Sequence, residues 1–330
     1  MKKTLLCTLV LLWMVSCKVP DHPTPFGSID RMDPGIDALI DPSATLEILA
    51  EGYDWSEGPV WIETEKMLLF SDVPQNTVYK WTEEKGVEVY LKPSGYTGTS
   101  ESNSAEEGSN GLAVDAHGKL VLCQHGDRRL AALEAPLNAP QAIFSTLAST
   151  YDGQKFNSPN DVTVRKNGDY FFTDPPYGLP KNLPQETPFQ GVYKLSNGKV
   201  TLLVDSISRP NGIAFMPGEK TLIIANSDPA KARWYSYDLS ENDSIIHGKI
   251  FYDATEAAKS ESGLPDGLKI DQQGNVFATG PGGLWIFNKD ARLLGKIKIP
   301  VATANCAFSE DQKTLFLTAD SYLLRLKMRN

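Results

Sequence analysis

Six short phrases along the sequence each carry one oxygen-bearing side chain. Each phrase combines small or polar residues and opens an apolar alternation, and the phrases recur about every 50 residues with a shorter last interval. Carboxylates and amide carbonyls that converge in a confined space need a counter-charge, and oxygen ligands without Cys or His favour a hard divalent cation. The six side chains that could supply this chemistry belong to Glu57, Asn110, Asn160, Asn211, Asp266 and Asn305.

A simpler interpretation remains open for each residue taken alone. Asn and Asp are common turn residues at the starts of strands, where their side chains bond to the backbone. A role in a turn explains one such residue more easily than six at equivalent positions of a repeat. It also gives no reason for Glu57 to be followed by Gly-Pro. The pattern therefore favours a cation site built from these six positions.

The elements that would position these side chains are short strands. In the third unit, residues 161–164, 170–173, 191–195 and 200–204 are rich in Val, Phe, Tyr and Leu, and turn residues separate them. Four strands per unit, repeated six times, predict an all-β fold, a six-bladed β-propeller with four-stranded blades. The innermost strand of each blade lines the channel, so the six side chains should meet around one axis. A β-sandwich or two stacked barrels is the structural alternative and leaves the repeated phrase unexplained.

The two ends of the chain should meet in one blade. After Asn305 there is room for three strands, at residues 306–308, 314–318 and 323–327. Residues 46–49 can supply the fourth, which would close the ring and leave no open sheet edge. The propeller domain is therefore predicted to span residues 44–330.

The N-terminus is typical of an exported protein. Two lysines precede an apolar run of about eleven residues, which is too short to span a bilayer and ends at Val15-Ser16-Cys17. Residues 1–17 are therefore expected to be a lipoprotein-type signal with Cys17 lipidated, a plain cleaved signal being the alternative. Residues 18–43, rich in Pro and Asp, are expected to be a tether. The protein would then be anchored by lipid to a bacterial cell envelope, on the periplasmic side, with no other membrane contact.

Composition and missing motifs exclude several functions. The chain of 330 residues has 32 Lys and Arg against 41 Asp and Glu, a net charge of -9, and no basic stripe, which argues against nucleic acid. It has no G-x-S-x-G, phosphate loop or H-E-x-x-H. Cys123 and Cys306 lie inside apolar strand patterns and are expected to be buried thiols. Nothing in the sequence favours one oligomeric state.

A second ring of polar residues is expected further from the axis, where the second strand of each blade ends. His125 is the histidine at such a position, and its neutral ring could serve as an acid or base, or simply bond at the rim. Asp174 ends another such strand, and Tyr177 follows it in a Pro-Pro-Tyr-Gly run that suggests a rigid aromatic wall or only a rigid turn. The candidate substrate-binding residues are Asn110, Asn160, His125, Asp174, Tyr177 and Asn305.

The phrases Ser56-Glu57-Gly58-Pro59, Pro210-Asn211-Gly212 and Pro265-Asp266-Gly267 resemble those of the senescence marker protein/gluconolactonase/luciferin-regenerating-enzyme family. The runs Cys123-Gln124-His125-Gly126 and Thr173 to Gly178 are most similar to its bacterial gluconolactonase branch. The resemblance implies a six-bladed propeller that hydrolyses sugar lactones to aldonic acids with one divalent metal ion in the channel. Ca²⁺ is the expected ion, with Mg²⁺, Mn²⁺ and Zn²⁺ as alternatives.

The resemblance also implies roles for single residues. Glu57, Asn211 and Asp266 match the family's metal-binding positions, and Asn160 matches an asparagine near metal and substrate. Animal members have a substrate-binding arginine where this chain has Ser158. The cation would polarise the lactone carbonyl, and Asp266, or His125 through a water, would take a proton from the attacking water. The alternatives are another esterase or phosphotriesterase activity at the same site, or a non-catalytic propeller that binds carbohydrate or protein.

Overall fold

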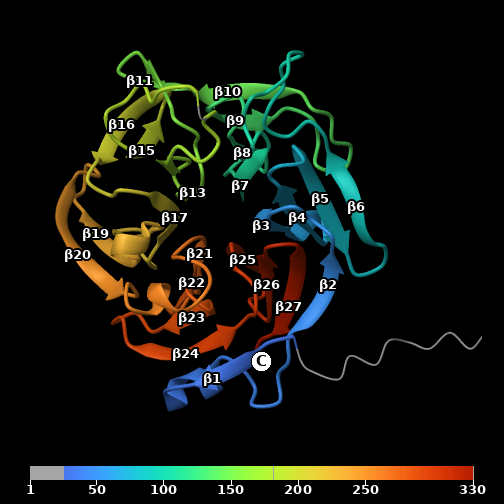
Figure 1. Cartoon of the computed structure of the whole chain (residues 1–330), viewed down its shortest axis with the longest axis vertical. Helices are drawn as coiled ribbons and strands as arrows, with labels where there is room; N and C mark the ends of the chain where they lie inside the picture. Colours follow the sequence, from blue (N-terminus) through green and yellow to red (C-terminus); the bar gives the residue numbers. More distant parts are fainter. Residues whose placement is uncertain (1–25, 181, 330) are drawn as a thin grey trace, which may run out of the picture.

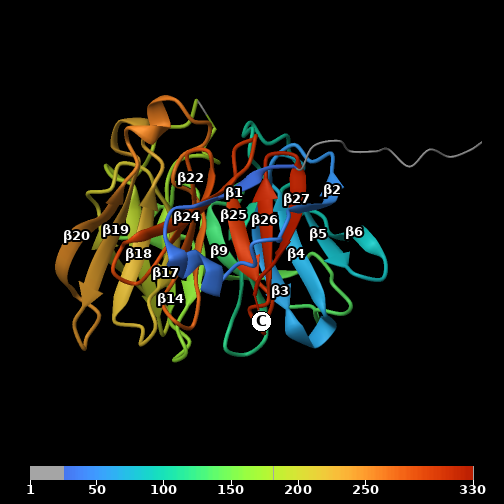
Figure 2. The same ribbon diagram turned by 90° about the horizontal axis from the view of Figure 1, so that it is seen from below.

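The computed structural model of the chain describes residues 26–180 and 182–329. Six antiparallel sheets surround a central channel, as Figure 1 shows down the axis and Figure 2 from the side. The predicted six-bladed β-propeller is therefore confirmed. Helical structure in the described part of the chain is limited to short 3-10 turns: η1 (Pro34–Ala38), η2 (Glu63–Glu65), η3 (Pro229–Lys231) and η4 (Ala257–Lys259). No helix of this part is long and apolar enough to cross a bilayer.

Five blades are continuous in the sequence and run from the channel outward. The first two contain β3 (Ser56–Ile62), β4 (Met67–Asp72), β5 (Thr77–Thr82) and β6 (Gly86–Leu91), then β7 (Ser109–Val114), β8 (Leu120–Gln124), β9 (Arg129–Leu133) and β10 (Phe144–Ala148). The next two contain β13 (Val162–Val164), β14 (Tyr170–Asp174), β15 (Gly191–Ser196) and β16 (Lys199–Val204), then β17 (Pro210–Phe215), β18 (Thr221–Asn226), β19 (Arg233–Leu239) and β20 (Ile245–Asp253). The fifth contains β21 (Leu268–Ile270), β22 (Val276–Gly280), β23 (Gly283–Phe287) and β24 (Leu293–Lys298). A small hairpin, β11 (Thr150–Tyr151) with β12 (Gln154–Lys155), follows the second blade.

The sixth blade joins the two ends of the described chain. Its strand order is β2 (Glu47–Glu51), β27 (Tyr322–Lys327), β26 (Thr314–Ala319) and β25 (Asn305–Phe308). Strand β2 pairs antiparallel with β27, so the predicted closure is confirmed, with β2 on the outer edge. Because this blade needs strands from both ends of the chain, the ring closes only when the whole domain has folded.

The predicted tether over residues 18–43 is wrong for residues 26–43. Strand β1 (Ser28–Arg31) adds a fifth strand to the outer edge of β24. After it, Asp33 caps η1 by accepting the N–H of Gly35, and Ile36 and Ile40 are fully buried against the fifth and sixth blades. Their apolar positions are too few to form a periodic pattern in the sequence. Residues 1–25, with the predicted signal and Cys17, lie outside the described residues.

Apolar side chains fill the spaces between neighbouring blades. Between the fourth and fifth blades, Trp234 of β19 lies 5.6 Å from Trp285 and 5.4 Å from Phe287 of β23, measured between ring centroids. Cys123 and Cys306 are fully buried free thiols, as predicted, and burial raises the pKa of Cys306 to about 12. Each inner strand is therefore held by packed blades on both sides, which makes the channel wall a rigid support for functional groups.

Candidate functional site

Three innermost strands bulge where the sequence places an oxygen-bearing side chain. The pairing register shifts between Glu57 and Val60 of β3, between Ser109 and Leu112 of β7, and between Pro210 and Ile213 of β17. A bulge adds one residue to a strand and changes the direction of a side chain, and bulges are common beside active sites. The repeated phrase therefore encodes a local break in the ladder at the inner end of these blades.

The glycine of the phrase allows neighbouring blades to approach closely. A Cβ atom on Gly58 would lie 2.1 Å from the carbonyl oxygen of Asn110, and one on Gly212 would lie 2.3 Å from that of Asp266. The inner strands are also bonded to each other, as in the 2.7 Å hydrogen bond from the N–H of Gly111 to the carbonyl of Asn160. Each phrase therefore contacts the next one around the ring, which keeps the channel narrow.

One cavity of 460 Å³ at the axis brings together five of the six predicted side chains. Glu57, Asn110, Asn160, Asn211 and Asp266 all line it. We call the part of the lining formed by these five residues the floor. The remaining lining is mixed: it includes the predicted Tyr177, the polar residues Glu106, Ser227, Glu261 and Thr303, and the apolar residues Trp55, Pro229, Ala258, Leu264 and Ala302. The site therefore combines a polar floor with apolar surface, the arrangement expected for a small organic ligand with several polar groups.

Burial controls the electrostatics of Glu57 and Asp266, two of the four carboxyl groups that line the cavity. Desolvation raises the pKa of Glu57 to about 7, although the N–H of Gly58, the amide of Asn305 and the charge of Lys269 act in the opposite direction. Desolvation, followed by the charge of Glu57, raises the pKa of Asp266 well above its ordinary value. Burial thus disfavours the ionised form of both carboxyl groups, and a bound cation would compensate for this cost.

Several oxygen atoms of the cavity have no partner in the protein. Asn110 Oδ1, Asn160 Oδ1 and Asp266 Oδ1 are buried without a hydrogen bond. Asn211 donates from Nδ2 to Ser227 Oγ at 3.0 Å, and Ser227 donates in turn to the carbonyl of Pro265 at 2.6 Å. Because Asn211 uses its Nδ2 in these hydrogen bonds, its amide oxygen Oδ1 remains available as an acceptor. Unpartnered carboxylate and amide oxygens are the donor set that hard cations prefer, so the residues present fit such an ion.

The composition of the site limits how a cation could be held. Within residues 26–180 and 182–329 no group of three or more His, Cys, Asp and Glu side chains is placed to hold a metal ion. Glu57 and Asp266 are the carboxylates among the phrase residues that line the cavity, and the asparagine oxygens of the same set could complete the coordination of an ion there.

Three predicted residues do not line the cavity. His125 is fully buried and lies behind the cavity wall, with Nδ1 3.5 Å from Oε2 of Glu106. Asp174 is also fully buried and accepts the N–H of Asn157 at 2.9 Å. Neither residue is part of the described cavity lining, and their contact with substrate stays a prediction. The sequence pattern placed the strand ends correctly, but loops over residues 104–108 and 175–178 cover them.

Asn305 lies against the cavity floor. It donates from Nδ2 to Oε2 of Glu57 at 3.2 Å, while its Oδ1 accepts the ammonium of Lys269 at 3.3 Å. These bonds let Asn305 support Glu57, while its predicted contact with substrate stays a prediction. Lys269 follows the fifth phrase on β21, inside a strand pattern that gave no sign of a channel residue.

Ser158 lies at the position where the resemblance places an arginine in animal members. Its Oγ donates to the carbonyl of Pro175 at 2.6 Å and accepts the N–H of Gly178 at 2.9 Å. These bonds fix the turn that brings Tyr177 into the cavity, where burial raises the pKa of its hydroxyl to about 12. Ser158 thus acts as a support for Tyr177.

Sequence reasoning missed Glu106 and Asp161. Glu106 lines the cavity from the loop that joins β6 to β7; that loop was rich in Ser, Gly and Glu but showed no periodicity. Asp161 stands where other phrases have glycine, and its Oδ2 is buried without a partner. Burial raises the pKa of Asp161, opposed first by the charge of Lys269.

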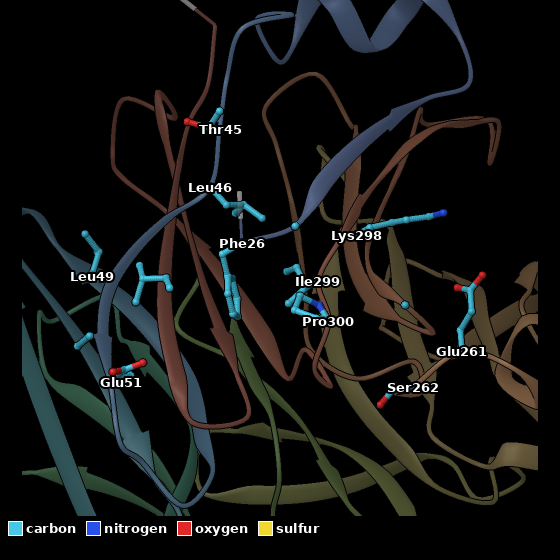
Figure 3. A pocket seen from close by; sticks show the side chains of 14 residues that line it. Phe26, Thr45, Leu46, Leu49, Glu51, Glu261, Ser262, Lys298, Ile299 and Pro300 are labelled. Carbon is cyan, nitrogen blue, oxygen red and sulfur yellow. The ribbon is translucent and has the colours of Figure 1, made fainter. Parts of the chain in front are cut away.

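A larger cavity of 1250 Å³ lies away from these residues. Figure 3 shows it between the start of the described chain, β2 and the end of β24, lined by groups such as Phe26, Leu46, Leu49 and Ile299. None of the six phrase residues lines it. Its charged lining residues, Glu51, Glu261 and Lys298, do not belong to the repeated phrases, so we place the candidate site in the channel.

Comparisons with known proteins agree with the geometry. Residues 55–321 match the SMP-30/Gluconolactonase/LRE-like region. A gluconolactonase of Zymomonas mobilis is 37% identical over 92% of this chain and 86% of its own. Among solved structures, a gluconolactonase of Xanthomonas campestris is 29% identical with a TM-score of 0.80, over 93% of this chain and 95% of the other. A regucalcin of Agrobacterium tumefaciens, described as a calcium-binding protein, is 17% identical with a TM-score of 0.67 over 86% of this chain and 94% of its own, which shows the same fold.

Proposed function

The chain belongs to the SMP-30/Gluconolactonase/LRE-like family, and we propose that it is a lactonase that opens sugar lactones to aldonic acids. The observation that carries the proposal is the meeting of Glu57, Asn110, Asn160, Asn211 and Asp266 in one cavity of 460 Å³. The similarity to the Zymomonas mobilis gluconolactonase over nearly the whole chain supports the same reaction class.

We further propose that Glu57, Asn160, Asn211 and Asp266 hold one divalent cation. Ca²⁺ suits two carboxylates and two amide oxygens best, and Mg²⁺, Mn²⁺ and Zn²⁺ are the alternatives. A bound cation would supply Lewis-acid polarisation of the lactone carbonyl. The support comes from the chain itself: the two carboxyl groups are buried with raised pKa values, and Oδ1 of Asn160 and of Asp266 lack a partner in the protein.

The residues of the cavity suggest how the reaction proceeds. Asp266 takes a proton from a water molecule as the water oxygen attacks the carbonyl carbon. The bond between the carbonyl carbon and the ring oxygen then breaks, the ring oxygen receives the proton held by Asp266 and leaves as a hydroxyl, and the former carbonyl carbon, now bonded to the water oxygen, becomes the carboxylic acid. The amide N–H groups of Asn110 and Asn160 stand on the same floor and can donate to the developing oxyanion. His125 is buried behind the wall, so Asp266 is the proposed base.

Turnover of glucono-δ-lactone tests this function directly. The wild-type protein should open the lactone, lose activity after chelation and regain it when Ca²⁺, Mg²⁺, Mn²⁺ or Zn²⁺ is returned separately. A panel of aldonolactones, aryl esters and phosphotriesters separates a lactonase from another hydrolase at this site. Binding of sugar without turnover of any of these substrates would contradict the proposal and favour a non-catalytic propeller.

We also propose that the protein is exported and anchored by lipid at Cys17. The support is the sequence of residues 1–17, with its two lysines, apolar run and terminal cysteine. In a bacterial host, the full-length wild-type protein should fractionate with membranes and incorporate labelled fatty acid, and C17S should do neither. Equal fractionation of C17S and wild type would overturn the anchor.

A further inference from the structure

The loop of residues 92–108 is built into the propeller. It leaves the first blade after β6 and returns at β7. Oδ1 of Asn76 accepts the N–H groups of Ser94 and Gly95 at 2.9 and 2.7 Å, while its Nδ2 donates to the carbonyl of Tyr96 at 2.9 Å. At the other end, the N–H of Gly108 donates to the carbonyl of Val73 at 2.8 Å. The loop is therefore fixed at both ends by buried groups of the first blade.

The middle of the loop is also anchored, and this places Glu106 at the channel. Ser104 donates from Oγ to the carbonyl of Gly178 at 2.8 Å and accepts the N–H of Glu106 at 3.1 Å. Glu106 lines the same cavity as Glu57 and Asp266. Its side chain is 36% exposed, so a ligand that enters the cavity can reach it.

A buried histidine backs the Glu106 carboxylate. Nδ1 of His125 lies 3.5 Å from Oε2 of Glu106, and neither ring nitrogen of His125 has a hydrogen-bond partner among the described residues. The ring is enclosed, because a Cβ atom on Gly178 would lie 2.4 Å from Cβ of His125. An enclosed ring cannot turn freely, so His125 presents one fixed polar edge to Glu106 and limits where that carboxylate can move.

The position of Glu106 suggests recognition of hydroxyl groups. A carboxylate is an acceptor with two oxygens, and it pairs well with the neighbouring hydroxyl donors of a sugar ring. Trp55, Pro229 and Leu264 line the same cavity and offer apolar surface that suits the C–H face of such a ring. We propose that Glu106 is a specificity-determining residue that accepts hydrogen bonds from ring hydroxyls of the lactone, with His125 as its positioning residue. The inference rests on the lactonase function proposed above.

Glu106→Gln tests the inference by selectivity. The measured quantity is kcat/KM for glucono-δ-lactone divided by kcat/KM for δ-valerolactone, which has the same ring without hydroxyls. The ratio should fall at least about tenfold in E106Q, because a hydrogen bond to a charged acceptor is lost only with the hydroxylated substrate. Turnover of δ-valerolactone should stay close to wild type. His125→Asn should lower the ratio less, since the carboxylate remains but loses its support.

Glu107→Gln is the matched control. Glu107 is the next residue of the same loop but lines a separate surface hollow with Tyr96 and Gly98. E107Q should keep the wild-type selectivity. Equal ratios in wild type and E106Q, or an equal loss of both substrates in E106Q, would overturn the proposed role of Glu106.

A binding measurement separates this inference from the lactonase proposal. 1,5-Anhydroglucitol carries the ring hydroxyls but has no carbonyl to hydrolyse, and tetrahydropyran has the ring alone. Calorimetry should show about tenfold weaker binding of 1,5-anhydroglucitol to E106Q than to wild type, and no difference for tetrahydropyran. If wild type opens neither lactone, the lactonase proposal fails, and this binding difference alone decides the role of Glu106. Equal affinity of both proteins for 1,5-anhydroglucitol overturns it.

Discussion

Two groups of carboxylates in this propeller, one partly buried and one fully buried, have opposite surroundings. Asp243, between the third and fourth blades, receives hydrogen bonds from Arg165 and Lys194, both at 2.5 Å. Burial alone would raise the pKa of Asp243, but these two bonds outweigh it and lower that pKa. In the channel, burial dominates and the pKa values of Glu57 and Asp266 rise. The chain neutralises its structural carboxylate and leaves the channel carboxylates for a ligand.

The difference identifies the functional site better than cavity size does. The Arg165 guanidinium also lies 4.9 Å above the ring of Phe171 and 4.8 Å above that of Phe215. The ion pairs around Asp243 are therefore also packed against aromatic rings. The channel oxygens, in contrast, include several without any partner. Unsatisfied buried polar atoms cost stability, and a fold keeps them where function requires them.

Asp266→Asn should give the largest effect. The change keeps the size of the side chain but removes both a cation ligand and the proposed base, so kcat for glucono-δ-lactone should fall by about a thousandfold or more. The assay is made with excess Ca²⁺ so that weaker cation binding does not limit the rate. Asp243→Asn is the control and should retain wild-type kcat. Wild-type turnover by D266N would show that this channel carboxylate is no more important for the reaction than Asp243.

Adding Ca²⁺ should stabilise the wild-type protein through the channel carboxylates. A ligand present at a hundred times its Kd raises the free energy of unfolding by about 2.7 kcal/mol, because it binds the folded state alone. Thermal unfolding with increasing Ca²⁺ should therefore show a rising Tm in wild type and in D243N. Glu57→Gln should show little or none of this rise. A full rise in E57Q would place the cation elsewhere.

Asn305→Ala should act through Glu57 with a smaller effect. The variant loses the 3.2 Å bond that orients the Glu57 carboxylate and the contact with Lys269. Residues that support metal ligands typically affect affinity by about ten- to a hundredfold. Calorimetric titration with Ca²⁺ should show this loss, while saturating Ca²⁺ should restore most of the activity. An unchanged affinity would show that Glu57 does not need the support of Asn305.

The repeat made the blades and five of the cavity residues predictable. The phrase encodes a strand start, a bulge and a close approach by glycine, and each of these is local in sequence. Glu106 and Lys269 could not be predicted in the same way. The position of Glu106 depends on hydrogen bonds that its loop donates to Asn76 and Gly178, which are distant from Glu106 in the sequence. For the same reason the burial of His125 was missed, because its covering loops come from other blades.

Asp243→Asn should lower stability without affecting the site. The pKa of Asp243 is lowered in the folded protein, so the stability that its charge contributes is present above the pKa of about 4 in the unfolded chain. That contribution is lost as the pH falls through the lower, folded-state pKa. Since the side chain is 12% exposed, the loss on mutation should be about 1 to 2 kcal/mol near neutral pH.

Denaturant unfolding of wild type and D243N at several pH values measures this difference. The gap in the free energy of unfolding should be constant from pH 5 to 8 and should shrink as the pH falls below about 4, because wild-type Asp243 then becomes neutral like asparagine. Lys194 and Arg165 remain charged throughout this range, so the change belongs to the carboxylate. If the difference in the free energy of unfolding grows on acidification, Asp243 is not the stabilising partner of these cations. Asp243 could then no longer be contrasted with the channel carboxylates as a structural group.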